Sequence, residues 1–185
     1  MNKNVIILLF NGRPNGNCAA IGNYIEQFYT RTNVHPFVID DQSYPACGGC
    51  NYECLKQNLI CPLLNDDQRK MMNTIIESDL VYFIVPSYCG YPCANYFAFN
   101  ERSVGYFNMD PSLMERYMSV AKRFIIVSNS VDHFAEAMQQ QTNNVPDILC
   151  LQSSKYGKQS IAGDIMDSAE AKTDLEAFLC NDRFL

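Results

Sequence analysis

The chain has 185 residues and a mass of 21.0 kDa, which fits one domain, and we expect a single domain over residues 1–185. Hydrophobic residues make up 48% of the chain and charged residues 18%, a balance that excludes intrinsic disorder. The formal net charge of −6 disfavours nucleic acid or an anionic membrane surface as a partner, because no basic patch offsets it.

The apolar runs of the chain are too short to cross a bilayer, which takes roughly 20 residues. The run near the start, residues 5–10, is also shorter than the core of a secretory signal. We therefore expect a cytoplasmic protein that does not bind membranes. In such a protein the nine cysteines are expected to be thiols, metal ligands or redox groups rather than a disulfide scaffold.

Five short apolar runs alternate with helical patterns. The runs are residues 5–10, 34–39, 80–85, 124–127 and 148–151, and they lack polar alternation, as do strands covered on both faces. Apolar residues at helical spacing are Ile21, Tyr24, Ile25 and Phe28, then Met71, Met72, Ile75 and Ile76, then Ala171, Leu175, Phe178 and Leu179. This alternation predicts an α/β fold with a doubly wound parallel sheet between two helix layers.

The first predicted strand runs into a turn of small and polar residues, numbers 11–18, that leads into a helix. Such a turn presents backbone N–H groups and a favourable dipole to an anion, and the guanidinium of Arg13 suits a phosphate. The turn is neither the triphosphate-binding G-x-x-x-x-G-K-[ST] nor the dinucleotide-binding G-x-G-x-x-G. The alternative is a plain strand–helix turn with Asn17 as the helix N-cap.

A second loop of interest, residues 86–94, follows the third predicted strand. In a doubly wound sheet a ligand binds where the strand order reverses, and in a sheet of order 2-1-3-4-5 this loop and the first one would flank that place. Tyr88 is suited to stack on a planar ring, and Gly90 allows close approach of a backbone. The alternative is a Pro/Gly turn with a buried tyrosine.

Both loops resemble those of the flavodoxin-like NAD(P)H-dependent FMN reductases and iron–sulfur flavoproteins. The phosphate loop of that family reads S-P-R-x-N-G-N-T; Arg13, Asn15, Gly16 and Asn17 match it, whereas Asn11 and Cys18 stand where the family has Ser and Thr. The family's second loop reads S-P-x-Y-W-G-S; Pro86, Tyr88 and Gly90 match it, and Cys89 stands at the usual Trp.

The resemblance implies a flavodoxin-like, five-stranded parallel sheet of order 2-1-3-4-5 that binds FMN. The phosphate would lie on the first loop and the ring beside the second. A polar stretch after the fourth strand would face the pyrimidine side, although this match is of position only and a helix cap is the alternative. The implied cofactor-binding residues are Asn11, Arg13, Asn15, Gly16, Asn17, Cys18, Pro86, Ser87, Tyr88, Cys89, Gly90, Ser128 and Asn129.

Four cysteines lie close together in the connection between residues 40 and 65, namely Cys47, Cys50, Cys54 and Cys61. Their density is that of an iron–sulfur or zinc ligand set. The iron–sulfur flavoproteins carry a four-cysteine motif at this point, usually with two residues between the second and third cysteines, where this chain has three. Cluster-free members keep cysteines here too, so a 4Fe–4S cluster, zinc and free thiols all stay open.

The resemblance implies an NAD(P)H-dependent FMN reductase-like oxidoreductase that passes electrons to a small-molecule or protein acceptor. Because the flavin carries the chemistry, no side chain is required as a catalytic acid or base. One alternative is an iron–sulfur flavoprotein that carries electrons between its cluster and FMN. Another is a non-enzymatic metal-binding or structural module on the same scaffold.

The segment 91–109 is rich in aromatic residues, namely Tyr91, Tyr96, Phe97, Phe99, Tyr106 and Phe107. One helix face offers about half of its positions to a core, so an exposed aromatic surface is expected. We therefore predict a homo-oligomer, most simply a two-fold dimer, with this segment near the flavin ring. The alternative is that the aromatics fill a local subdomain with residues 109–118.

Overall fold

The computed structural model describes residues 3–10, 13–30, 32–40, 47–48, 50–56, 61–63, 66–127 and 133–181. Its parallel strands are β1 (Asn4–Leu9), β2 (Asn33–Val38), β3 (Leu80–Tyr88), β5 (Ala121–Val127) and β6 (Asp147–Leu151). They lie in the order β2-β1-β3-β5-β6, and the short β4 (Tyr91–Pro92) pairs antiparallel with the end of β3. Counted over the parallel strands, this is the predicted flavodoxin-like order 2-1-3-4-5.

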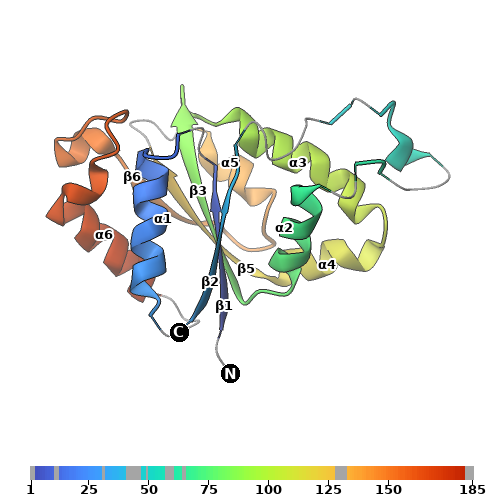
Figure 1. Ribbon diagram of the computed structural model, residues 1–185, viewed down its shortest axis with the longest axis horizontal. Helices are drawn as coiled ribbons and strands as arrows, with labels where there is room; N and C mark the ends of the chain where they lie inside the picture. The colour runs from blue at the N-terminus through green and yellow to red at the C-terminus, as the bar shows by residue number, and fades with distance from the viewer. Residues whose placement is uncertain are drawn as a thin grey trace.

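Helices cover both faces of the sheet, as predicted (Figure 1). One layer holds α1 (Asn17–Phe28) and α6 (Ala169–Cys180), and the other holds α2 (Asp67–Ile76), α3 (Ala94–Phe107), α4 (Pro111–Ser119) and α5 (Phe134–Gln139). Short 3-10 turns are η1 (Glu53–Leu55), η2 (Ser153–Tyr156) and η3 (Ile165–Asp167). Among the described residues no helix has the length and apolar character needed to cross a membrane.

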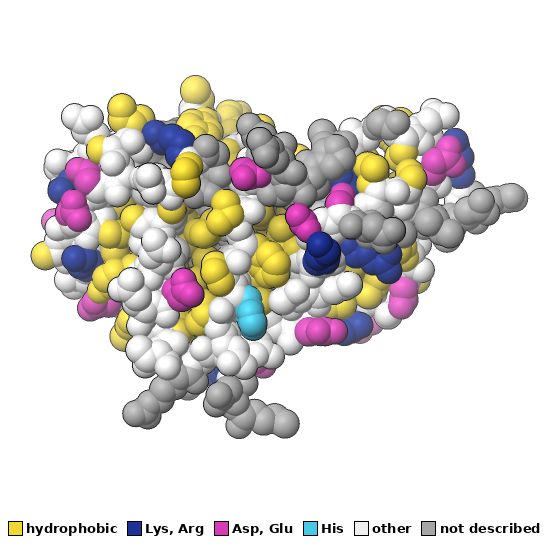
Figure 2. Space-filling view, in the orientation of Figure 1, with side chains coloured by type: hydrophobic (Ala, Val, Ile, Leu, Met, Phe, Trp, Pro, Cys, Tyr) yellow, Lys and Arg dark blue, Asp and Glu magenta, His cyan; other side chains and the backbone are white. Residues whose placement is uncertain are grey.

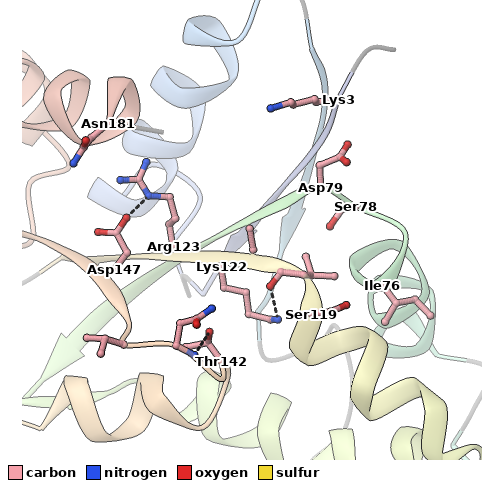
Figure 3. Close-up of a pocket in the computed structure, with 14 residues that line it drawn as sticks. Lys3, Ile76, Ser78, Asp79, Ser119, Lys122, Arg123, Thr142, Asp147 and Asn181 are labelled. Atoms are coloured by element: carbon pink, nitrogen blue, oxygen red, sulfur yellow. Dashed lines mark hydrogen bonds and ion pairs between the residues drawn. The ribbon is translucent and has the colours of Figure 1, made fainter. Parts of the chain in front are cut away.

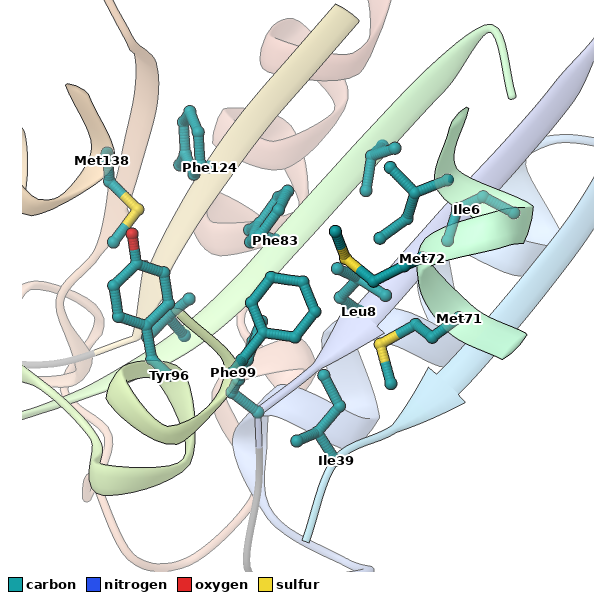
Figure 4. Packing of buried hydrophobic residues seen from close by; sticks show 14 of the residues in the cluster. Ile6, Leu8, Ile39, Met71, Met72, Phe83, Tyr96, Phe99, Phe124 and Met138 are labelled. Atoms are coloured by element: carbon teal, nitrogen blue, oxygen red, sulfur yellow. The ribbon is translucent and has the colours of Figure 1, made fainter. Parts of the chain in front are cut away.

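The central strand β3 is buried on both faces because its side chains alternate between two cores. Phe83 points to the layer of α2, α3, α4 and α5, where its ring centroid lies 5.2 Å from that of Phe124 and 6.2 Å from that of Phe99 (Figure 4). Tyr82 points to the layer of α1 and α6, where its hydroxyl is 2.5 Å from that of Tyr29. The long apolar run in the sequence therefore reflects cover from both sides.

The expectation that every strand is covered on both faces is wrong for β2. Val34 and Phe37 are only partly buried, and Val38 is 53% exposed. The physical reason is its place at the edge of the sheet, where β1 is its neighbour and where Pro36, which lacks an N–H donor, is tolerated. Apolar side chains accordingly gather in the middle of the face shown in Figure 2.

The strand predicted at residues 124–127 begins earlier, at Ala121, because two buried cations belong to it. Lys122 donates from Nζ to the carbonyl oxygens of Tyr117 and Val120 at the carboxyl end of α4, and burial lowers its pKa to about 8. Arg123 points to the other face, where Nε donates to Asp147 Oδ2 at 2.6 Å. Because these two residues are charged, the apolar pattern of the sequence does not include this part of the strand.

These two cations line an open groove of about 1040 Å³ at the amino ends of the strands (Figure 3). The groove also contains Lys3, Asp79 and Asn181. It lies at the edge of the sheet opposite to the loops that the sequence singles out. Lys122 and the Arg123–Asp147 ion pair already have protein partners there. We therefore assign the groove no function.

The aromatic segment is divided between core and surface. Tyr96, Phe99 and Tyr106 of α3 are buried, and Phe107 packs on Tyr117 of α4 at 5.3 Å between ring centroids. Two of the six aromatics are exposed, namely Tyr91 and Phe97. Most of the segment therefore fills a core shared with α4, which is the local subdomain of the alternative. Dimerisation through the remaining two stays a prediction.

Two phenylalanines of α3 provide a matched test of this division. Phe99 is completely buried, whereas Phe97 is 43% exposed. Replacing Phe99 by Ala should lower the free energy of unfolding by about 3–5 kcal/mol, because it leaves a cavity beside Phe83. Replacing Phe97 by Ala should change it by about 0.5 kcal/mol. Urea denaturation measures both, and equal losses would contradict the packing of α3.

Candidate functional site

The two loops that the sequence singles out meet at the carboxyl ends of β1 and β3. These strands pair in parallel, with Leu9 opposite Ile84, and the N–H of Phe10 donates to the carbonyl of Ile84 at 3.0 Å. β1 is followed by the connection to β2 on one side, and β3 by the connection to β5 on the other. This is the point where the strand order reverses, and open α/β sheets bind ligands there.

The first loop turns tightly into α1. The N–H of Gly16 donates to the carbonyl of Arg13 at 3.2 Å, and Gly16, in an extended conformation, is the N-cap of the helix. Asn17 is the first helical residue, so the alternative that made Asn17 the N-cap is wrong. The first turn of α1 carries no acidic residue, and a helix start of this kind favours an anion.

Two predicted phosphate ligands contact a distant part of the chain. Arg13 is exposed and donates from Nη1 to the carbonyl of Ile161 at 3.2 Å. Asn17 is buried and donates from Nδ2 to the carbonyl of Ser160 at 3.1 Å, while its Oδ1 accepts the N–H of Ile165 at 3.1 Å. Asn17 therefore links the start of α1 to the connection between β6 and α6.

Cys18 lies beneath this loop as part of the core. Burial raises the pKa of its thiol to about 12; the nearby Cys93 thiol adds to the rise, and Arg13 opposes it. At neutral pH the Cys18 side chain is therefore a neutral, weak hydrogen-bond donor. It contributes packing where the resembling family has a threonine hydroxyl.

The second loop is a hairpin that extends the strand predicted to end at residue 85. β3 continues to Tyr88, whose register partner is Tyr91 of β4. The turn between them has Cys89 at φ 53° and Gly90 at φ 84°, the left-handed pair that a tight hairpin favours. Tyr88 is 57% exposed, so the alternative of a buried tyrosine is wrong and its ring is accessible.

His133 anchors this hairpin, and sequence reasoning assigned it no role. Its ring stacks on that of Tyr91 with 4.3 Å between centroids, and its backbone N–H donates to the carbonyl of Gly90 at 3.2 Å. The sequence carries no signal for this contact, since it depends on how α5 returns to the carboxyl edge. Pro86 and Ser87 are partly buried in the hairpin stem. Three other predicted ligands, Asn11, Ser128 and Asn129, lie outside the described residues.

The four clustered cysteines lie away from the sheet, beyond α3, in the segment that carries η1 (Figure 1). Cys54 and Cys61 are buried against Gly105 of α3, where an added Cβ would be 3.1 Å from Cys61 Cβ. Burial raises the pKa of Cys54, and the thiols of Cys61, Cys47 and Cys50 raise it further. Yet the described residues hold no group of three side chains placed to bind a metal ion. Their geometry therefore does not fit a metal or cluster site.

This geometry predicts a protein without a stoichiometric metal. Anaerobically purified protein should contain iron and zinc well below one equivalent, because no three of the described side chains are placed to bind a metal ion together. Elemental analysis of wild type, of Cys54→Ser and of the exposed control Cys180→Ser measures this. One equivalent or more of metal in wild type and in the control, lost from Cys54→Ser, would contradict the arrangement.

Solved structures share the fold at low identity. The Trp repressor binding protein from Bacillus subtilis has a TM-score of 0.62 at 12% identity, over 97% of this chain and 99% of that one. An NADH:FMN oxidoreductase in its apo form has a TM-score of 0.56 at 10% identity, over 98% of this chain and 91% of that one. FerB from Paracoccus denitrificans, a flavoenzyme NAD(P)H:(acceptor) oxidoreductase, has a TM-score of 0.52 at 10% identity, over 96% of this chain and 96% of that one. No family model and no curated protein matches the sequence.

Proposed function

We propose that this protein is an FMN-dependent oxidoreductase that takes electrons from NAD(P)H and passes them to a small-molecule or protein acceptor. The observation that carries the proposal is the meeting of the 13–18 loop and the 86–90 hairpin at the ends of β1 and β3. Each loop matches part of an FMN-binding motif, and each lies where that motif is needed. The similar fold of proteins described as an NADH:FMN oxidoreductase and an NAD(P)H:(acceptor) flavoenzyme supports the proposal.

The first loop would hold the phosphate of FMN. The guanidinium of Arg13 is exposed beside the start of α1, so one fixed charge and one helix dipole favour an anion at the same place. The neutral thiol of Cys18 adds no charge that would oppose a phosphate.

The hairpin would hold the flavin ring. Tyr88 presents an accessible aromatic face, and the Tyr91–His133 stack fixes the hairpin against α5. FMN, when bound, supplies the hydride and electron chemistry, and the chain supplies binding and orientation. The nicotinamide of NAD(P)H would stack in the same crevice.

Removal of the Arg13 charge tests the phosphate assignment. Arg13→Ala should weaken FMN binding roughly 10- to 100-fold, because charge-assisted hydrogen bonds to the phosphate are lost. Arg116→Ala removes an equal charge from the exposed side of α4 and should leave the affinity unchanged. Quenching of FMN fluorescence measures both. If Arg13→Ala and wild type bind FMN equally well, the phosphate does not lie on this loop.

Reduction by a pyridine nucleotide tests the activity itself. Under anaerobic conditions, NADH or NADPH added to the FMN-loaded protein should bleach the flavin absorption, and an added quinone or dye should restore it. FMN in the same buffer without protein gives the background rate. If neither nucleotide reduces bound FMN faster than this background rate, the protein binds a flavin but lacks the proposed activity.

A further inference from the structure

The connection between β6 and α6, residues 152–168, is much longer than the usual 2–6 residues of such loops. Part of it, residues 160–165, lies across the 13–17 loop, and we call this part the strap. Figure 1 shows the connection rising beside the amino end of α1. The candidate phosphate site and the strap therefore occupy the same end of the sheet.

The strap contacts the phosphate loop at four of its residues, and the last of these contacts is the N–H of Ile165, which donates to Asn17 Oδ1. The carbonyl of Ile161 accepts from Arg13, and the carbonyl of Ser160 accepts from Asn17. Two residues after Ile161, Gly163, at φ 76°, passes so close to the loop that an added Cβ would be 2.3 Å from the carbonyl oxygen of Asn15. A side chain at position 163 would collide with backbone, so this close approach requires glycine.

The strap and a phosphate would use the same donors. Arg13 and Asn17 both belong to the predicted phosphate loop, and here Arg13 Nη1 and Asn17 Nδ2 donate to strap carbonyls. Each of these nitrogens carries two N–H groups, so the competition concerns orientation: while both side chains are held toward strap carbonyls, they are not free to turn toward a phosphate. The strap also brings the ion pair of Asp164 with Lys158 to this end of the sheet.

The closed strap contains a buried carboxylate oxygen that has no hydrogen bond among the described residues. Asp164 Oδ2 is 3.5 Å from Lys158 Nζ, but its Oδ1 is buried without a hydrogen-bond partner in the part of the chain that the structure describes. A buried carboxylate oxygen without a hydrogen bond costs free energy, so the position of Asp164 makes the closed strap less stable than a fully hydrogen-bonded one.

We propose that the strap regulates the candidate FMN site by competing with the phosphate for Arg13 and Asn17. It closes on the loop when the site is empty and leaves when the phosphate monoester of a flavin nucleotide binds. This inference rests on the proposed function. Because the open form alone binds the phosphate, the apparent affinity for FMN depends on the fraction of protein with an open strap.

Two glycines of the same connection form a matched pair for the test. Gly163→Ala adds a methyl group that collides with Asn15, whereas Gly157, at φ 65°, has nothing within 4 Å of an added Cβ. Both substitutions place alanine in a left-handed conformation, but only Gly163→Ala forces the strap off the loop. Gly163→Ala should therefore bind FMN at least about threefold more tightly than Gly157→Ala. Affinity equal to or weaker than that of Gly157→Ala would overturn the proposal.

A second measurement needs no variant. Trypsin cleavage after Lys158, two residues before the strap, followed by mass spectrometry, reports how readily this part of the connection opens. FMN should accelerate cleavage several-fold, whereas riboflavin, which has the same ring without the phosphate, should not. Cleavage that FMN slows or leaves unchanged would overturn the proposal even if FMN binds. If neither wild type nor any variant binds FMN, the proposed function itself fails, and the strap's role fails with it.

Discussion

The parallel pairing of β1 with β3 is the interaction on which the candidate site depends. Both strands are buried on both faces, and a shift of one residue would turn the core residues Ile7 and Phe83 to the wrong sides of the sheet. This register brings Phe10 beside Ile84 and so brings the two loops together. The position of the site is thus a consequence of core packing.

The two loops are stabilised in different ways. The hairpin is held locally, by its own turn and by the stack of Tyr91 on His133. The phosphate loop is held from a distance, because Asn17 is linked to Ser160 across 143 positions of sequence. The hairpin can therefore present Tyr88 whether or not a ligand is present. The shape of the phosphate loop, in contrast, depends on what the connection between β6 and α6 does.

Much of the fold could be predicted from the sequence, because runs buried on two faces leave an unmistakable apolar pattern. The strand predicted at 5–10 differs from Asn4–Leu9 by one residue at each end. The prediction failed where a charged residue is buried or where an apolar strand is exposed. Arg123 is buried by an ion pair, and β2 is apolar yet lies at an edge of the sheet. The sequence also did not show which aromatic residues of α3 are buried and which are exposed, because this depends on how α4 packs.

Of the candidate site, the sequence predicted which two loops lie together but not what each residue contacts. Arg13 and Tyr88 are exposed at the predicted place. Asn17 matches the motif, yet its side chain is used within the protein, and only a contact between distant segments reveals this. The clustered cysteines show the opposite case. Their spacing indicates a metal site, and their described geometry does not form one.

The central claim is that the FMN phosphate lies at the start of α1 beside Arg13. Phosphorus NMR of FMN bound to the protein, followed from pH 5 to pH 8, tests it most directly. Free FMN takes up a proton with a pKa of about 6, as phosphate monoesters do. A guanidinium and a helix N-terminus both stabilise the dianion, so the account predicts that the signal of bound FMN stays constant over this range. A bound signal that shifts with pH as free FMN does would place the phosphate in solvent and contradict the account.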